Sequence, residues 1–86
     1  MSLPAQFRLT GHARRRMAER DISEGQISEA LQNPTKIGRD TRQRTLIKKV
    51  YERKGKKRLL LLAMEWESDR FCIVTVIDTT KVKKYL

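Results

Sequence analysis

A proline at position 34 divides this chain into two patterns. Apolar residues before Asn33-Pro34 recur at helical spacing, whereas the segments after it are rich in the β-branched and apolar residues typical of strands. Pro34 itself cannot continue a helix, because it lacks an N–H and its ring crowds the preceding turn. The sequence therefore predicts an α+β domain, with helices from the first part packed on a sheet made by the second.

Two helices are predicted before the proline. Thr10 is suited to cap the N-terminus of a helix over residues 11–20. Ser23-x-x-Gln26 is a capping box, which opens a second helix with apolar residues on one face. Because only Asp21-Ile22 separates the first helix from this capping box, we expect the two helices to form a helical hairpin.

Four strands are predicted after the proline, and the last two are apolar on both faces, so they should be central. Two helices can cover only one face of such a sheet. The other face, on which we place Lys48 or Lys49, Tyr51 and Thr75, is then available as a working surface. Residues 7–9 are a candidate for a further short strand ahead of the helices. The four strands are expected at residues 36–39, 45–53, 58–66 and 71–79.

Length and cysteine content limit the classes of protein that remain. The chain has 86 residues, which suits one small domain and is too short for the large cofactor-binding folds. Cys72 is the only cysteine, so no disulfide can form within the chain, and no His, Cys or acidic residues show metal-ligand spacing. We expect no cofactor and no metal. The chain also lacks an apolar run of about 20 residues and a secretion signal, so we expect no membrane partner and a cytoplasmic location.

Positive charge is concentrated in one segment. The formal net charge is +10, and residues 35–58 hold eleven basic and two acidic side chains. This excess indicates a polyanionic partner. The Lys and Arg residues between positions 42 and 58, here called the basic hairpin, would contact phosphates, and Tyr51 or Tyr85 would stack on bases. The alternative is a solvated strand edge whose lysines prevent aggregation. For Trp66 and Phe71 we expect core or hairpin packing.

The first helix carries the residues suited to chemistry. At 100° per residue, His12, Arg16, Glu19 and Arg20 fall on one arc beside the apolar stripe. An imidazole can exchange protons near neutral pH, and guanidinium groups can stabilise charge on a phosphate, so these residue types suit RNA cleavage without metal. The alternative is structural: His12 donates to a backbone carbonyl or to Glu19, and Glu19 pairs with an arginine.

The motif around these residues resembles that of a known family. Residues 12–23 read H-A-x-x-R-M-x-E-R-x-I-S, and the Ile-Val-Thr-Val-Ile core of the last strand and the closing Lys-Lys-Tyr are also similar. Together they resemble a small bacterial family of domains of unknown function that is grouped with the RelE/ParE toxin superfamily and is similar to the BrnT toxins. The resemblance covers nearly the whole chain.

This resemblance carries expectations for fold and activity. It implies that residues 1–86 form a single RelE/ParE-like domain, a two-helix hairpin on a curved, mainly antiparallel four-stranded sheet. It further implies a toxin that cleaves free or ribosome-bound mRNA without metal, with an acidic antitoxin as partner. The alternatives are a non-catalytic basic module that binds RNA or an acidic protein, and a gyrase-inhibiting toxin of the ParE type.

The site residues follow from the motif and from residue type. His12 is expected to act as general base or acid, Arg16 and Arg20 to stabilise the phosphate, and Glu19 to orient His12 or an arginine. The resemblance adds Thr75 on the last strand, and residue type adds Lys48, Arg58 and Tyr85. The residues expected to bind nucleic acid are Arg44, Lys48, Lys49, Arg58, Thr75, Lys83, Lys84 and Tyr85.

Overall fold

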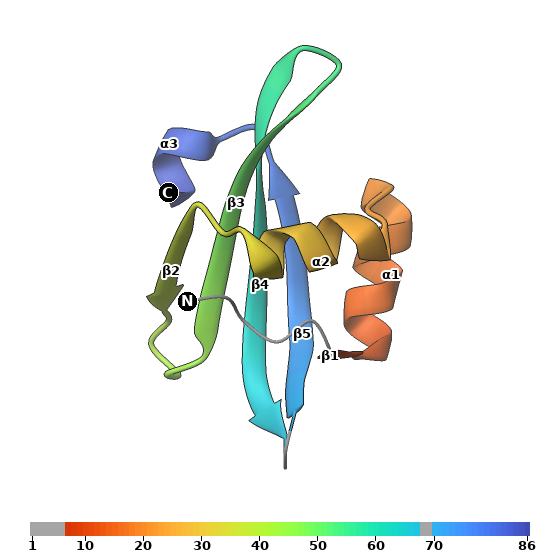
Figure 1. The fold of residues 1–86 in the computed structure, drawn as a ribbon, viewed down its shortest axis with the longest axis vertical. Coiled ribbons are helices and arrows are strands. Elements are labelled where there is room, and N and C mark those ends of the chain that lie inside the picture. The colour runs from red at the N-terminus through yellow and green to blue at the C-terminus, as the bar shows by residue number, and fades with distance from the viewer. Residues whose placement is uncertain (1–6, 68–69) are drawn as a thin grey trace.

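The computed structural model describes residues 7–67 and 70–86, which form five strands and three helices (Figure 1). In chain order these are β1 (Phe7–Leu9), α1 (Gly11–Arg20), α2 (Glu24–Gln32), β2 (Lys36–Arg39), β3 (Thr45–Arg53), β4 (Lys56–Glu67), β5 (Arg70–Thr79) and α3 (Val82–Tyr85). The two helices and four strands expected from the sequence are all present, with ends within two residues of those predicted. Among the described residues, no helix has the length and apolar character needed to cross a membrane.

The sheet is mixed and has the strand order β1-β5-β4-β3-β2. β1 lies parallel to β5, with Phe7 opposite Phe71, and all other neighbours are antiparallel. The expected four-stranded, mainly antiparallel sheet of RelE/ParE type is therefore wrong. A three-residue strand is too short to show an alternating pattern, and its partner lies near the other end of the chain, so local signals could not fix this pairing.

Both helix starts are confirmed as predicted. The Thr10 hydroxyl accepts a hydrogen bond from the Ala13 N–H at 3.1 Å and so caps α1. Ser23 and Gln26 form the reciprocal capping box, each side chain accepting a 3.1 Å hydrogen bond from the other residue's N–H. These caps satisfy N–H groups that would otherwise have no partner in the first turn.

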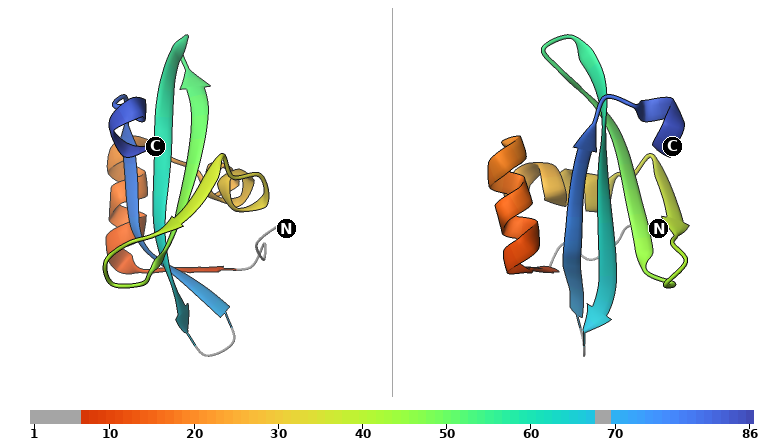
Figure 2. Two further views of the ribbon diagram at one scale, coloured as in Figure 1. Left: turned by 90° about the vertical axis from the view of Figure 1, so that its left-hand side faces the viewer. Right: turned by 180° about the vertical axis from the view of Figure 1, so that it is seen from behind.

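The two helices do not form the expected hairpin. α1 runs along β5, whereas α2 runs across the strands on one face of the sheet (Figures 1 and 2). Asp21 ends α1 in the left-handed conformation (φ 56°), and buried Ile22 donates from its N–H to Met17 at 2.8 Å. Because α2 begins directly after Ser23, this turn redirects the chain instead of reversing it. α3, where the sequence showed only a basic tail, contacts β4 and lies toward the edge of the sheet that β2 forms, far from the α1 edge (Figure 1).

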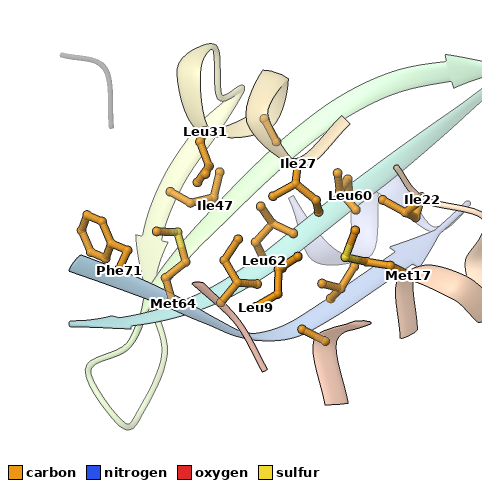
Figure 3. Close-up of a cluster of buried hydrophobic side chains, with 14 residues drawn as sticks. Leu9, Met17, Ile22, Ile27, Leu31, Ile47, Leu60, Leu62, Met64 and Phe71 are labelled. Atoms are coloured by element: carbon orange, nitrogen blue, oxygen red, sulfur yellow. The ribbon is translucent and has the colours of Figure 1, made fainter. Parts of the chain in front are cut away.

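The hydrophobic core lies between the helices and the sheet (Figure 3). α1 contributes Ala13 and Met17, and α2 contributes Ile27 and Leu31. The sheet contributes side chains from every strand except β2, chiefly Leu9, Ile47, Leu60, Leu62, Met64, Phe71, Ile73 and Val76. Burial of these side chains holds α1 against β5 and fixes the polar side of that helix in place.

A bulge in β5 changes which side chains face the core. Thr75 pairs with Ala63 and Ile73 pairs with Met64, so Val74 is an extra residue without a partner on β4. Phe71 and Ile73 join the hydrophobic core before the bulge, and Val76 joins it after the bulge. Without the bulge, strict alternation would place Asp78 on the opposite face.

The two faces also differ from expectation in β3. Lys49 and Tyr51 lie on the face that α2 covers, since the ammonium of Lys49 donates to the carbonyl of Asn33 at 2.8 Å and Tyr51 packs against the core. Lys48, one position away, therefore lies on the other face. The working surface proposed from the sequence does not exist as one continuous face.

Candidate active site

A hollow of about 290 Å³ lies between α1 and β5. Three of the side chains that line it were predicted to be catalytic, and a fourth, Thr75, was predicted to bind nucleic acid. The lining residues are His12, Arg16 and Arg20 from α1, and Thr75, Val76, Ile77 and Asp78 from β5. Positions four residues apart lie on one side of a helix, which explains why these three side chains share the hollow.

Both ends of α1 are tied to the sheet. At the start, the Thr10 N–H donates to the carbonyl of Ile73 at 3.2 Å, next to the bulge in β5. At the end, the guanidinium of Arg53 donates to the carbonyls of Arg20 at 3.2 Å and Asp21 at 2.6 Å. A cation at the C-terminus of a helix is favourable because the last carbonyls lack partners within the helix. The hollow is therefore bounded by two fixed elements.

The side chains in the hollow differ in their pairing. Arg16 lies 3.6 Å from Glu19, but both side chains are about half exposed, so this ion pair contributes little to stability. Glu19 does not line the hollow. Within residues 7–67 and 70–86, the imidazole of His12 makes no hydrogen bond and Arg20 makes no ion pair. The hydrogen bond from His12 to a backbone carbonyl or to Glu19, which a structural role would require, is therefore absent from this part of the chain.

The wall of the hollow contains a buried carboxylate that sequence reasoning missed. The side chain of Asp78 is only 2% exposed, and its carboxylate accepts a 2.6 Å hydrogen bond from the Tyr51 hydroxyl. The guanidinium of Arg58 lies 2.9 Å from the same carboxylate. An acidic residue within an apolar strand was the available signal, because a carboxylate is rarely buried without a partner.

These contacts affect the partners of Asp78. Burial raises the pKa of the Tyr51 hydroxyl, and the hydrogen bond to Asp78 raises it further. The hydrogen bond to Asp78 likewise raises the pKa of the Arg58 guanidinium. Because Arg58 balances the charge of Asp78, Arg16 and Arg20 still give the hollow a positive charge.

Most residues expected to bind nucleic acid lie outside the hollow. Arg44 is bonded to Asp40 at 2.7 Å, Lys49 lies 3.7 Å from Glu29, and Arg58 is engaged by Asp78. Lys48 lies on the face opposite α2, and Lys83, Lys84 and Tyr85 are on α3. Of the residues predicted for this role, only Thr75 lines the hollow in the described structure. The basic hairpin is thus separate from the hollow that contains His12, Arg16 and Arg20.

Metal ligation has no candidate among the residues that the structure describes, since they contain no group of three or more His, Cys, Asp or Glu suited to hold an ion. Cys72 is buried and free, and burial raises the pKa of its thiol. A thiol in this environment is a core side chain and not an activated nucleophile.

Comparison with known proteins identifies a family. The model of a family described as a domain of unknown function, DUF4258, matches residues 9–85 and so spans both walls of the hollow. No curated protein and no solved structure matches the chain.

Proposed function

The chain belongs to the DUF4258 family, and we propose from its site that it is an endoribonuclease that cleaves RNA in the α1–β5 hollow without a metal ion. The observation that supports this most is the presence of His12, Arg16 and Arg20 in one hollow. An exposed imidazole beside two guanidinium groups provides a proton acceptor and a binding site for a phosphodiester.

The proposed reaction is an internal transesterification. His12 takes the proton from a ribose 2′-hydroxyl, and the 2′-oxygen attacks the adjacent phosphorus. The bond from phosphorus to the 5′-oxygen breaks, and that oxygen takes a proton from water. The products are a 2′,3′-cyclic phosphate and a 5′-hydroxyl, and the imidazolium returns its proton to solvent. The reaction requires a 2′-hydroxyl, so DNA is not a substrate.

The arginines act on the charge that develops at phosphorus. Arg16 and Arg20 would donate hydrogen bonds to the non-bridging oxygens, which carry more negative charge in the transition state than in the substrate. Glu19 would hold Arg16 in position through their 3.6 Å contact. Removing one such donor typically lowers the rate by about 10²–10³-fold.

For the biological setting we propose a cytoplasmic toxin that an acidic antitoxin neutralises. The motif of residues 12–23 supports this through its resemblance to the BrnT and RelE/ParE toxins, and the net charge of +10 suits an acidic partner. The mixed five-stranded sheet differs from the sheet that the resemblance implied, so the motif and charge alone support the toxin setting.

A chimeric oligonucleotide tests the activity directly. The substrate is DNA with a single internal ribonucleotide, incubated with the purified chain in the presence of a chelator. We expect cleavage only at the ribonucleotide, with a 2′,3′-cyclic phosphate on the upstream product. His12→Ala should lower the rate by about 10²–10⁴-fold, and Arg20→Ala by about 10²–10³-fold.

Arg14 provides the matched control for these variants. It is exposed on the same helix but points away from the hollow, so Arg14→Ala removes one charge and should leave the cleavage rate within about twofold. Equal cleavage by wild type and His12→Ala would overturn the assignment of the base. If wild-type chain cuts neither free RNA nor ribosome-bound mRNA, the proposal of a ribonuclease is wrong. DNA breaks after expression in bacteria would instead favour the gyrase-inhibiting alternative.

A further inference from the structure

A second cleft, of about 370 Å³, lies at the opposite end of β4 from the β3–β4 hairpin. The loop between β2 and β3 forms one wall, and the end of β4 forms the other. Its lining includes Arg39, Arg42, Arg44, Met64, Glu65 and Trp66. It shares no lining residue with the α1–β5 hollow, so whatever binds there is a separate contact.

Trp66 is the unusual feature of this cleft. It is the only tryptophan in the chain and is 64% exposed, so of the two expectations, core or hairpin packing, only hairpin packing on Phe71 is met. The indole stacks on buried Phe71, its cross-strand partner, with ring centroids 4.0 Å apart and an interplanar angle of 31°. An aromatic ring that is held in one orientation and still exposed is a preformed surface for stacking.

The loop that faces Trp66 is held by Asp40. Its carboxylate accepts hydrogen bonds of 2.9 Å from the N–H groups of Arg42 and Arg44 and one of 2.7 Å from the Arg44 guanidinium. Gln43 completes the turn in the left-handed conformation (φ 64°). The backbone that carries the arginines is therefore fixed by internal bonds and not by a ligand.

The charge of the cleft is positive. Asp40 balances Arg44, but neither Arg39 nor Arg42 has an ion pair within the described part of the chain. Glu65 contributes one negative charge and precedes Trp66 on β4, so its side chain leaves the opposite face of the strand. Arg39 and Arg42, which have no ion pair among residues 7–67 and 70–86, thus lie in the same cleft as one exposed indole.

We propose that this cleft binds an unpaired nucleobase of single-stranded RNA, stacked on Trp66, with adjacent phosphates contacting Arg39 and Arg42. Base stacking on an aromatic side chain tolerates any sequence but needs a base that is free on one face. A duplex hides both faces of its bases, so it could offer only phosphates. That single-stranded RNA is the substrate rests on the proposed ribonuclease activity. That the cleft binds single-stranded RNA does not.

Both sites involve residues at or next to β5. Trp66 pairs with Phe71, and Thr75 of the hollow lies four residues further along β5. At about 3.3 Å per residue this separation is roughly 13 Å. The Val74 bulge places Thr75 on the face opposite to that of Phe71 and Trp66, so RNA that contacts both sites would pass around the edge of the sheet.

Tryptophan fluorescence tests the proposal, because Trp66 is the only tryptophan in the sequence and so the source of the whole signal. The probe is a short single-stranded oligonucleotide of 2′-O-methyl RNA, which cannot be cleaved because its 2′-oxygens are blocked. We expect this probe to quench Trp66, and a duplex of the same sequence to leave the fluorescence unchanged. Trp66→Ala should weaken binding by about 5- to 150-fold, and Trp66→Phe by much less.

Two further variants separate stacking from charge. Arg42→Gln should lower by about one unit the slope of log affinity against log salt, because one phosphate contact is lost. Ile37 is 47% exposed on β2 and lies outside the cleft, so Ile37→Ala is the matched control for loss of an exposed apolar side chain. It should bind the probe within about twofold of wild type.

Unchanged Trp66 fluorescence at saturating probe would overturn the proposal, as would equal binding by Trp66→Ala and wild type. Either result would leave the exposed indole as a surface for a protein partner. The test does not depend on cleavage, since the blocked 2′-oxygens of the probe prevent it. Failure of the ribonuclease proposal and failure of this one can therefore be told apart.

Discussion

Asp78 shows how a single residue connects the stability of the sheet with the site. Its carboxylate is buried in the wall of the hollow and is held by Tyr51 and Arg58. Removing one partner of a buried charge costs more than the net value of the pair, because the charge that remains is neither solvated nor paired. The three side chains should therefore respond to substitution as one unit.

Tyr51→Phe tests this unit. At neutral pH the substitution removes the 2.6 Å hydrogen bond, and we expect the free energy of unfolding to fall by about 1.5–3 kcal/mol. The pKa of Tyr51 is raised in the folded state. Its contribution to stability is therefore fully present below the unfolded pKa of about 10 and is lost as pH rises through the higher folded value. The difference between the two proteins in urea unfolding should therefore shrink above pH of about 10. A constant difference there would contradict this role for the Tyr51 proton.

At the scale of elements, the caps of α1 and α2 are chemically alike but differ in what they support. Thr10 caps the helix that carries the proposed catalytic residues, and Ser23 caps the helix that covers the sheet. Loss of either hydroxyl leaves an N–H without a partner in the first turn. The loss of stability should therefore be similar for the two helices, whereas the loss of activity should differ.

Thr10→Ala and Ser23→Ala form a matched pair for this comparison. Each should lower the free energy of unfolding by about 1 kcal/mol, as measured by chemical denaturation. Only Thr10→Ala should slow cleavage of the chimeric oligonucleotide, because fraying of the first turn of α1 displaces His12. Equal activity of the two variants would show that the position of His12 does not depend on this cap.

At the scale of the whole molecule, stability depends on a small core shared by nearly all elements. A domain of this length buries only about 60–65% of the surface of its unfolded chain, so single core positions carry a large share of its stability. Leu62 is fully buried in the core on central strand β4, and Leu61 is its partly exposed neighbour on the other face.

Leu62→Ala should therefore lower the free energy of unfolding by about 2–5 kcal/mol, through lost burial and the cavity that remains. Leu61→Ala removes the same atoms from the opposite face of the strand and should cost clearly less. Thermal unfolding of the two variants checks this. Equal losses would mean that α3 and its neighbours form a second core of equal weight.

The local parts of this structure were predictable from the sequence. The caps at Thr10 and Ser23, the end of the second helix before Pro34 and the four later strands all depend on residues a few positions apart. The same holds for the alignment of His12, Arg16 and Arg20, because helical spacing places such residues on one side.

The tertiary structure decided what these elements face. Pairing of β1 with β5 joins the two ends of the chain, and the Val74 bulge turns Asp78 toward Tyr51 and Arg58. Trp66 is exposed although its large, mostly apolar side chain favours burial. Contacts of this kind join residues far apart in the chain, and their energies depend on packing and register. Periodicity and spacing in the sequence therefore do not predict them.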